Sequence, residues 1–387
     1  MSLKPGWRRV KFGDVVRQVK DRVDPETSGI ERYIAGEHMD TDDLRLRRWG
    51  DVGEGYLGPA FHMRFRPGHV LYGSRRTYLR KVAVADFEGV CANTTFVIEP
   101  STDDLLLEFL AYVMTAEAFH EHSIKQSKGS VNPYINFTDL KWYEFALPPI
   151  DEQKRIVEVL EAVAGALEQQ REVSQRSTDL IAGLLSGADG VATVKLQDVC
   201  RETITYGIVQ AGPYVDGGVP YIRVSDMTEA DVLAPALLSK TSTAIADRYR
   251  RSACEPGDLV FALRGPIGLT RVVPEDLRGA NLTQGTARLA PNTAVVSSAC
   301  LQWLLRSPGV QRQYRRVQKG STFQELSLGA LRSIEIASLD GDEQVRFVVR
   351  LTAAAKVSSG AASAISTLRD LSKQTREHLL NGAADVR

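Results

Sequence analysis

Cysteine is scarce in this sequence of 387 residues, and the four cysteines that are present lie far apart. Cys91, Cys200, Cys254 and Cys300 form no CxxC pair, which is the spacing of zinc sites and thiol-exchange centres. This scarcity excludes a disulfide-rich secreted domain. We expect four reduced thiols, most of them buried, in a cytoplasmic protein.

The sequence also lacks long apolar runs and a surplus of either charge. No stretch approaches the roughly 20 apolar residues that cross a bilayer, and residues 1–11 are basic and polar, unlike a signal peptide. We therefore expect no membrane partner. Basic and acidic residues number 48 each, so the net charge is zero. Because a protein that grips DNA alone usually has a basic surplus, a DNA binder of this composition is expected to share its phosphate contacts with a partner.

Signatures of enzymes are absent or incomplete. The run Asn132-Pro133-Tyr134 resembles part of an adenine-methylating active site, but it lacks the second proline and follows no glycine-rich motif for S-adenosylmethionine. The glycine pair at 265–268 is not followed by the Gly-Lys-Ser/Thr of a phosphate loop. His120-Glu121-His122 lacks the i, i+4 spacing of a zinc helix. We expect no catalytic residues, no metal site and no cofactor in this chain.

What the sequence does contain is a weak internal repeat. Matching runs recur in the same order, with an offset that drifts from 184 (Val10 to Val194) to 191 (Asp151 to Asp342). One short match is chance, but several in one order indicate two copies of one unit. The matched runs are 10–15 with 194–199, 67–70 with 256–259, 128–130 with 319–321, and 151–153 with 342–344.

Each copy ends in a long helix with a heptad seam. Residues Ile156, Leu160, Val163 and Leu167 begin a seam that steps by 4 and 3, and Phe347, Leu351, Ala354, Ser358 and Ala361 begin its counterpart. Such alternation is typical of a coiled coil. We predict an α+β fold with two pseudo-repeated globular domains, separated by two long helices packed as an antiparallel coiled coil. The expected segments are domain 1 (1–150), helix 1 (151–188), domain 2 (189–341) and helix 2 (342–387).

The helix length sets an expected separation. At 1.5 Å per residue each helix would be roughly 54 Å long, so two reading domains would contact DNA sites roughly 15 base pairs apart. The expected target has two short specific elements with an unread spacer. The alternative is a helix that lies on the surface of its own domain.

Three basic features are candidate DNA contacts. One is the loop after each Pro-Gly strand, one is the Lys-Gly-Ser turn, and one is the arginine-rich helix face around 312–319. Arginine, lysine and hydroxyl groups on loops can reach phosphates or guanine edges, although ordinary exposed surface and a plain helix stop remain alternatives. The candidate residues are Arg75, Arg76, Tyr78, Lys128, Ser130, Arg264, Arg271, Arg315, Arg316, Lys319 and Ser321.

The run from Phe145 to Val157 resembles a known junction. Its sequence, FALPPIDEQKRIV, is similar to the "PLPPxxEQxxI" run that joins a target recognition domain to a conserved helix in the specificity subunits of type I restriction-modification enzymes. The Pro-Gly strands and Lys-Gly-Ser turns also look like that family. The second junction, 336–344, lacks the double proline, so docking there is expected to differ in detail.

This resemblance implies function and partners. Such a subunit reads double-stranded DNA and binds two adenine-methylating subunits, which carry S-adenosylmethionine, and two ATP-driven restriction subunits can join. The helix starts would form the docking surface, with capping of the helix as the alternative role of the same residues. The candidate partner contacts are Glu152, Gln153, Arg155, Glu343, Gln344 and Arg346.

Other classes of protein stay open on the sequence. A two-domain DNA-binding adaptor of another defence or regulatory system would use the same domains without a methyltransferase. A coiled-coil scaffold would bind protein and no nucleic acid. An active nuclease or methyltransferase would show activity from this chain alone.

Overall fold

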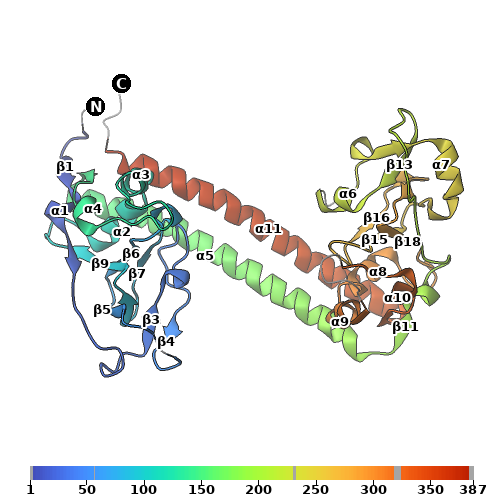
Figure 1. Ribbon diagram of the computed structural model, residues 1–387, viewed down its shortest axis with the longest axis horizontal. Helices are drawn as coiled ribbons and strands as arrows, with labels where there is room; N and C mark the ends of the chain where they lie inside the picture. The colour runs from blue at the N-terminus through green and yellow to red at the C-terminus, as the bar shows by residue number, and fades with distance from the viewer. Residues whose placement is uncertain (1–2, 56, 230–231, 318–323, 383–387) are drawn as a thin grey trace. The chain divides into compact units, whose positions relative to one another are not determined.

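The computed structural model describes residues 3–55, 57–229, 232–317 and 324–382 of the chain (Figure 1). Two compact units divide it: the first comprises Met1–Gln170 with Ala364–Arg387, and the second comprises Arg171–Ser363. Each unit therefore holds one globular part and a part of both long helices, α5 (Ile150–Gly187) and α11 (Gly341–Leu380). The four segments expected from the sequence have different boundaries, because they keep each long helix as one undivided segment.

Two four-stranded sheets and a two-stranded ladder build the globular part of the first unit. One sheet has the antiparallel order β2-β9-β6-β7, and the other has the order β4-β3-β8-β5, in which β3 and β8 run parallel. The ladder pairs the first strand, β1, with β10, which precedes α5. The strands are β1 (Arg8–Lys11), β2 (Val16–Val19), β3 (Arg32–Ile34), β4 (Gly50–Asp51), β5 (Phe61–Phe65), β6 (Val70–Gly73), β7 (Val82–Val84), β8 (Gly89–Ala92), β9 (Thr95–Pro100) and β10 (Glu144–Leu147).

The strands expected after the two Pro-Gly turns are confirmed. Strand β6 follows Gly68, whose φ of 91° suits glycine, and β15 (Leu259–Ala262) follows Gly257, whose φ is 84°. Each strand is flanked by a neighbour on both sides and is buried at almost every position. A run that is apolar at consecutive positions fits a strand covered on both faces.

The amphipathic stretches 105–125 and 297–317, each of which has the length of one helix, form two helices apiece. The first becomes α2 (Leu107–Thr115) and α3 (Glu117–Lys125), with an extended residue, Ala116, between them. The second becomes α8 (Ser298–Leu304) and α9 (Pro308–Val317). Pro308 has no amide hydrogen and so begins a helix rather than continuing one. The other short helices of the first unit are α1 (Phe12–Val15) and α4 (Phe137–Leu140).

The main core of the first unit lies between the β2-β9-β6-β7 sheet and helices α2 and α3. Phe119 is fully buried and meets Tyr72 and Tyr143 edge to face, at ring-centroid distances of 5.6 Å and 5.2 Å. Ile156 and Leu160 of α5 belong to the same core. Burial of each such side chain stabilises the fold by about 1.5–3 kcal/mol, so the start of α5 is fixed on the first domain.

The second unit repeats this topology within its described residues, except that its second sheet has three strands where that of the first unit has four. Its sheets have the orders β12-β18-β15-β16 and β14-β13-β17, with β13 and β17 parallel, and β11 pairs with β19 as β1 pairs with β10. The internal repeat seen in the sequence is therefore a repeat of the fold. Its elements are β11 (Thr193–Lys195), β12 (Thr205–Tyr206), β13 (Val219–Ile222), α6 (Val224–Glu229), β14 (Ser239–Thr241), α7 (Thr243–Arg248), β16 (Thr270–Val272), β17 (Asn281–Leu282), β18 (Thr286–Leu289), α10 (Leu328–Arg332) and β19 (Glu335–Ala337).

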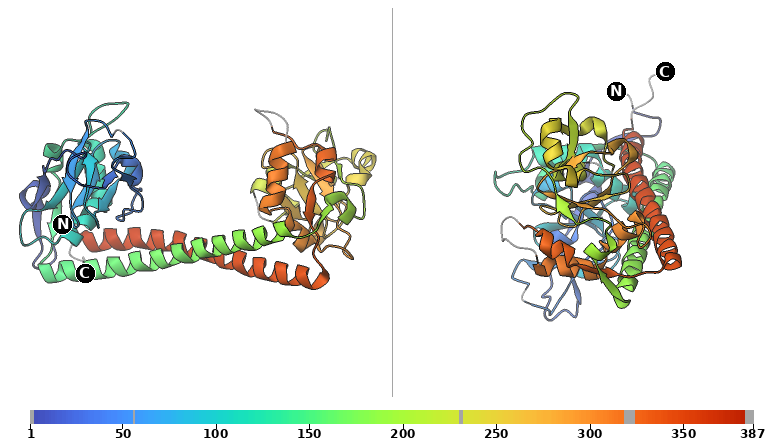
Figure 2. Two further views of the ribbon diagram at one scale, coloured as in Figure 1. Left: turned by 90° about the horizontal axis from the view of Figure 1, so that it is seen from below. Right: turned by 90° about the vertical axis from the view of Figure 1, so that its right-hand side faces the viewer.

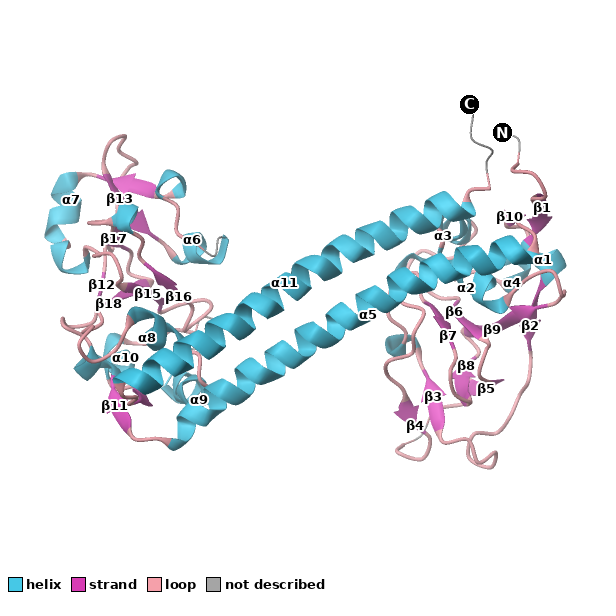
Figure 3. Cartoon of the chain, turned by 180° about the vertical axis from the view of Figure 1, so that it is seen from behind, coloured by secondary structure: helices cyan, strands magenta, loops and turns pink. Residues whose placement is uncertain are grey.

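The predicted helix pairing is present within each unit. In the first unit the last turns of α11 run beside the first turns of α5, in the opposite direction (Figure 2). In the second unit the end of α5 lies beside the start of α11 (Figure 3). The residues that the heptad pattern assigns to the seam are buried or half-buried along both helices, whereas Val345 and Val349 off the seam are exposed. The seam prediction is confirmed.

The four cysteines are free thiols, and three of them are buried. Burial raises the pKa of Cys91, Cys254 and Cys300 to about 12 and that of Cys200 to about 11. The thiolate is the reactive form of cysteine. These thiols are therefore unreactive at neutral pH and act as small apolar side chains.

Candidate nucleic-acid interface

The loop after β6 holds the first group of candidate residues. The main chain of this loop is held on two sides, because the Ser74 amide donates to the Thr94 carbonyl at 2.9 Å and the Ile135 amide donates to the Ser74 carbonyl at 3.0 Å. As a result, Arg75 forms an antiparallel bridge with Tyr134. The loop is thereby fixed although it lies at the surface.

Tyr134 joins this loop to the Lys-Gly-Ser turn. It makes a second antiparallel bridge with Lys128, whose two backbone hydrogen bonds measure 2.8 Å and 2.9 Å. Directly opposed residues of an antiparallel pair project to the same face. Arg75, Tyr134 and Lys128 therefore form an exposed row in which a tyrosine ring, 42% exposed, stands between two cations. Cations suit phosphates and an exposed ring suits stacking on a base.

Arg76 extends this row with a strained backbone. Its φ of 51° lies in the left-handed region, which a residue with a Cβ adopts at a cost. Two hydrogen bonds hold it there: its amide donates to the Pro133 carbonyl at 2.6 Å and its Nε donates to Asn132 Oδ1 at 2.9 Å. Asn132 thus orients the exposed arginine through its Nε.

Lys128 has an acidic neighbour. Its Nζ donates to Asp139 Oδ2 at 2.9 Å, and this hydrogen bond lowers the pKa of Asp139. The pair is exposed, so it is screened and contributes little to stability. Lys128 is thus oriented by Asp139 and remains accessible to an anion. Ser130 is exposed on the same turn, after Gly129 with a φ of 89°.

Tyr78 lies on a short 3-10 turn, η2 (Thr77–Leu79), next to Arg76. Thr77 is buried and its hydroxyl is 2.8 Å from that of Ser127, just before the Lys-Gly-Ser turn. Tyr78 itself is exposed. The sequence-predicted residues Arg75, Arg76, Tyr78, Lys128 and Ser130 therefore lie on two neighbouring, mutually braced segments of the first unit.

A small cavity of about 260 Å³ adjoins the row. Its lining includes Arg75, Tyr134 and, from the β8–β9 turn, Asn93, with Phe96 as its apolar part. Amide, guanidinium and phenol groups around an apolar wall are the groups that read the edge of a base.

The second unit builds the same backbone arrangement. The Leu263 amide donates to the Gly285 carbonyl, the Leu326 amide donates to the Leu263 carbonyl, each at 2.9 Å, and Arg264 forms an antiparallel bridge with Glu325. Arg264 therefore occupies the place of Arg75, and Glu325 occupies the place of Tyr134. The predicted equivalence of the two loops is confirmed in the structure.

The other predicted residues of the second unit are placed less closely together. Arg271 lies on β16, where its Nη1 donates to the Thr270 carbonyl at 3.2 Å. Arg315 and Arg316 are exposed at the end of α9. Arg312, which the sequence groups with them, pairs with Asp189 at 3.0 Å. Lys319 and Ser321 lie outside the described residues.

Gln153 requires a correction. The sequence offers it as a partner contact, but its side chain is 0% exposed. Its amide donates to the carbonyls of Asp104 at 2.7 Å and Pro148 at 2.9 Å, and it accepts the Leu106 amide at 2.8 Å. Gln153 therefore joins the start of α5 to the start of α2, because those backbone groups would otherwise be unpaired.

Gln344 has the same structural role in the second unit. It donates to the carbonyls of Val295 and Leu339 at 2.7 Å and 3.0 Å and accepts the Ser297 amide at 3.0 Å. Glu343 accepts the Asp340 amide, and Asp340 accepts that of Glu343, which is a reciprocal cap of α11. These bonds engage the side-chain amide of the half-buried Gln344, and its role as a partner contact stays a prediction.

The remaining partner candidates are accessible. Arg155 is exposed and pairs loosely with Glu152 at 3.5 Å, and Arg346 is exposed on α11. Their role as contacts for other subunits stays a prediction.

Sequence reasoning missed Tyr134 and Glu325. Tyr134 was considered only as part of an incomplete methylation motif, and Glu325 carries no local signal. Each is brought to its arginine by a bridge between segments that are distant in the chain. The one available signal was the position of each residue a few places after its Lys-Gly-Ser turn.

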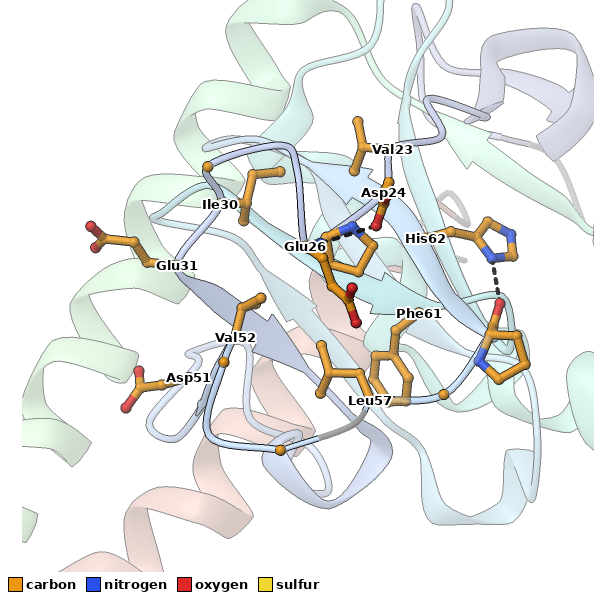
Figure 4. A pocket seen from close by; sticks show the side chains of 16 residues that line it. Val23, Asp24, Glu26, Ile30, Glu31, Asp51, Val52, Leu57, Phe61 and His62 are labelled. Carbon is orange, nitrogen blue, oxygen red and sulfur yellow. Dashed lines mark hydrogen bonds between the residues drawn. The ribbon is translucent and has the colours of Figure 1, made fainter.

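A larger pocket of the first unit has the wrong charge for DNA. It encloses about 1160 Å³ and is lined by Ile30 and Phe61 together with four carboxylates, among them Glu26, Glu31 and Asp51 (Figure 4). Negative charge repels phosphates. This pocket therefore does not belong to the candidate interface.

Two searches of the described residues were negative. Within them, no three or more histidine, cysteine, aspartate or glutamate side chains are grouped as metal ligands. None of the helices that the structure describes is both long enough and apolar enough to cross a membrane.

Comparison with known proteins finds one family model and several relatives that resemble this chain. Residues 51–174 match the model of the type I restriction modification DNA specificity domain. The specificity subunit of the type I restriction enzyme EcoDI from Escherichia coli is 28% identical over 176 residues. That match covers 44% of this chain and 38% of the relative, so the chain matches well under two thirds of the length of that protein.

Solved structures share the fold along the whole chain. A chain from a structure on complex assembly and conformational transition of a type I restriction-modification system is matched over 99% of both chains, with a TM-score of 0.61 and 21% identity. The S subunit of the type I restriction-modification system from M. genitalium matches 100% of this chain and 99% of its own, with a TM-score of 0.59 and 14% identity. The chain is therefore similar to the specificity subunits of type I restriction-modification enzymes: residues 51–174 match their DNA specificity domain, and the chain shares the fold of the solved structures, in agreement with the sequence resemblance.

Proposed function

We propose that the chain is the DNA sequence-recognition subunit of a type I restriction-modification complex. In this proposal each globular domain reads one element of a bipartite double-stranded DNA site. The observation that carries the proposal is the repeated loop arrangement, in which Arg75 and Arg264 occupy the same place in two copies of one fold. Two copies of one reading surface in one chain fit a target made of two elements.

In the proposed complex the chemistry belongs to the partner subunits. Two adenine-methylating subunits, which bring S-adenosylmethionine, dock on the helices, and two ATP-driven restriction subunits can join them. The zero net charge supports this division, because a complex that encloses DNA can take much of its basic surface from the partners. The exposed side chains of Arg155 and Arg346 are available for such docking.

DNA binding by the assembled complex tests the proposal. We expect the chain with its methyltransferase subunit to bind its target more tightly than either component does. Arg75→Ala should weaken binding and reduce the slope of log affinity against log salt by about 1 if the lost contact is to a phosphate. Arg9→Ala, an exposed arginine on β1, serves as the control. Equal affinity of the wild-type complex and the methyltransferase subunit alone for the target would overturn the proposal.

A further inference from the structure

The two candidate reading loops differ in one respect that bears on the sequence they read. In the second unit Arg264 Nη2 donates to Glu325 Oε1 at 2.9 Å, and the two side chains are 45% and 46% exposed. In the first unit the same place is taken by Arg75 and the uncharged Tyr134. Only the second unit therefore places a carboxylate beside its reading arginine.

Folding gives no reason for this carboxylate. An ion pair as exposed as this one contributes little to stability, and the equivalent backbone bridge in the first unit forms without it. A carboxylate on a surface that approaches phosphates is also repelled by them. Glu325 is compatible with DNA binding where it meets a hydrogen-bond donor on the DNA.

The ion pair presents a defined order of hydrogen-bonding groups. Glu325 offers an acceptor, and beside it Arg264 offers two or more donors, held in place by the bond between them. In the major groove a C·G pair presents the complementary order: the cytosine N4 donor, then the guanine O6 and N7 acceptors. In an A·T pair each side of the single N6 donor carries one acceptor, so Arg264 would lose one of its two bonds.

We propose that Arg264 and Glu325 act as one unit that reads a single C·G base pair in the half-site of the second domain. Glu325 accepts from cytosine N4 while Arg264 donates to guanine O6 and N7. This inference rests on the proposed function and specifies part of its DNA target. The first domain, with Tyr134 in place of Glu325, makes no such reading.

Base analogues test the pair with the wild-type complex, so that no variant needs to fold. Once the bipartite motif is known, each required guanine of one half-site is replaced in turn by 7-deazaguanine, and each cytosine by N4-methylcytosine. At one C·G pair we expect each replacement to weaken binding, by roughly tenfold for 7-deazaguanine. If binding is unchanged by the analogues at every required C·G pair of both half-sites, the inference is overturned. It is also overturned if neither half-site requires a C·G pair.

A variant then assigns the effect to Glu325. Glu325→Gln exchanges one acceptor oxygen for an NH₂ donor, and when the remaining oxygen keeps the bond from Arg264, the side chain no longer accepts from cytosine N4. We expect the complex carrying Glu325→Gln to lose its preference for C·G at that one position and to keep every other requirement in both half-sites. Glu275→Gln, which alters an exposed Arg278–Glu275 pair (2.6 Å) near the other end of β15, is the matched control and should change nothing.

The outcomes distinguish a failure of this inference from a failure of the proposed function. If Glu325→Gln keeps the wild-type preference at every position, and the analogues also have no effect, the inference is wrong while the proposed function stands. If Glu325→Gln abolishes binding, the wild-type analogue series still decides the question. If the wild-type complex recognises no bipartite motif, the proposed function fails and the inference fails with it.

Discussion

Arg76 and Gly265 hold the same left-handed backbone conformation, with φ of 51° and 67°, at matching places in the two units. Each follows the arginine that bridges to the opposing segment. The turn requires this conformation in both copies, and glycine meets the requirement without strain. The first unit keeps an arginine there at a cost of about 1–2 kcal/mol, and we predict that its side chain serves binding.

Replacing Arg76 should separate stability from binding. For Arg76→Gly we expect the free energy of unfolding to stay within about 1 kcal/mol of wild type, because relief of strain offsets the added freedom of the unfolded chain. DNA affinity of the complex should fall, since the guanidinium is lost. Urea denaturation of the chain and binding of the complex at several salt concentrations measure the two effects. Unchanged DNA affinity would contradict the assigned role of Arg76.

The matching change in the second unit, Gly265→Ala, should lower the free energy of unfolding. Gly265→Ala places a Cβ on a residue with a positive φ, in a space where the nearest atom, Val224 Cγ1, is 3.8 Å away. No collision follows, so the expected loss of about 1–2 kcal/mol comes from the backbone conformation alone. Gly329→Ala, inside helix α10 with nothing near its Cβ, should not destabilise the chain. Equal stability of the Gly265→Ala chain and wild type would contradict the strained geometry.

Gln153 should be a determinant of stability and not of partner binding. Gln153→Ala leaves two carbonyls and one amide without their partner in a buried place, so we expect a loss of about 2–4 kcal/mol. Glu152→Ala, at the half-exposed neighbouring position, should cost less than about 0.5 kcal/mol. Denaturant titration of both variants makes the comparison. Coincident unfolding curves for Gln153→Ala and wild type would refute the structural role.

The helix seam should respond according to burial. Leu351 is 0% exposed and Leu371, on the same helix, is 45% exposed. Leu351→Ala should therefore destabilise the chain by about 2–5 kcal/mol, whereas Leu371→Ala should change the free energy of unfolding by less than about 1 kcal/mol. The pair is matched in residue type, so equal effects in thermal or denaturant unfolding would show that the seam is wrongly assigned.

His120 should make the stability of the first unit depend on pH. Burial, together with the positive charges of Arg80 and Arg376, lowers its pKa to about 3, and neither ring nitrogen has a hydrogen-bond partner. Because the folded pKa lies below the unfolded value of about 6.5, the unfolded state binds the proton first as pH falls. The stabilising contribution is therefore complete above about pH 6.5 and is lost progressively between about pH 6.5 and 3.

A variant without His120 isolates the contribution of this residue to the pH dependence of stability. Between pH 7.5 and 5.5 we expect wild type to lose about 1 kcal/mol more than His120→Leu, which cannot titrate. His378→Gln, at an exposed position of α11, should follow wild type. Parallel losses in wild type and His120→Leu across this range would show that another group is responsible.

The sequence predicts those features that depend on local pattern. The heptad steps through Ile156 and Leu351 identify the helices, and the Pro-Gly turns identify β6 and β15, because each signal lies within a few residues. It also locates the Arg75 and Arg264 loops, since the repeat places them in register. The break at Ala116 was missed, because its extended backbone carries no proline or glycine signal.

What the sequence does not predict depends on contacts between distant segments. The opposition of Arg264 and Glu325, and the burial of the Gln153 amide, arise only when separate strands and helix ends meet. The family motif drew attention to Gln153, but a recurring residue in a motif can serve packing as well as binding. The structure distinguishes the two roles by the three backbone groups that the amide joins.

The most direct test of the central claim is a genome-wide map of adenine methylation. Two hosts are compared, one making the methyltransferase subunit with this chain and one making the methyltransferase subunit alone. We expect a bipartite methylated motif with a fixed unread spacer, present only with this chain, and a change confined to one element of that motif for Arg75→Ala. The absence of any new motif, with both subunits intact and bound to each other, would contradict the account.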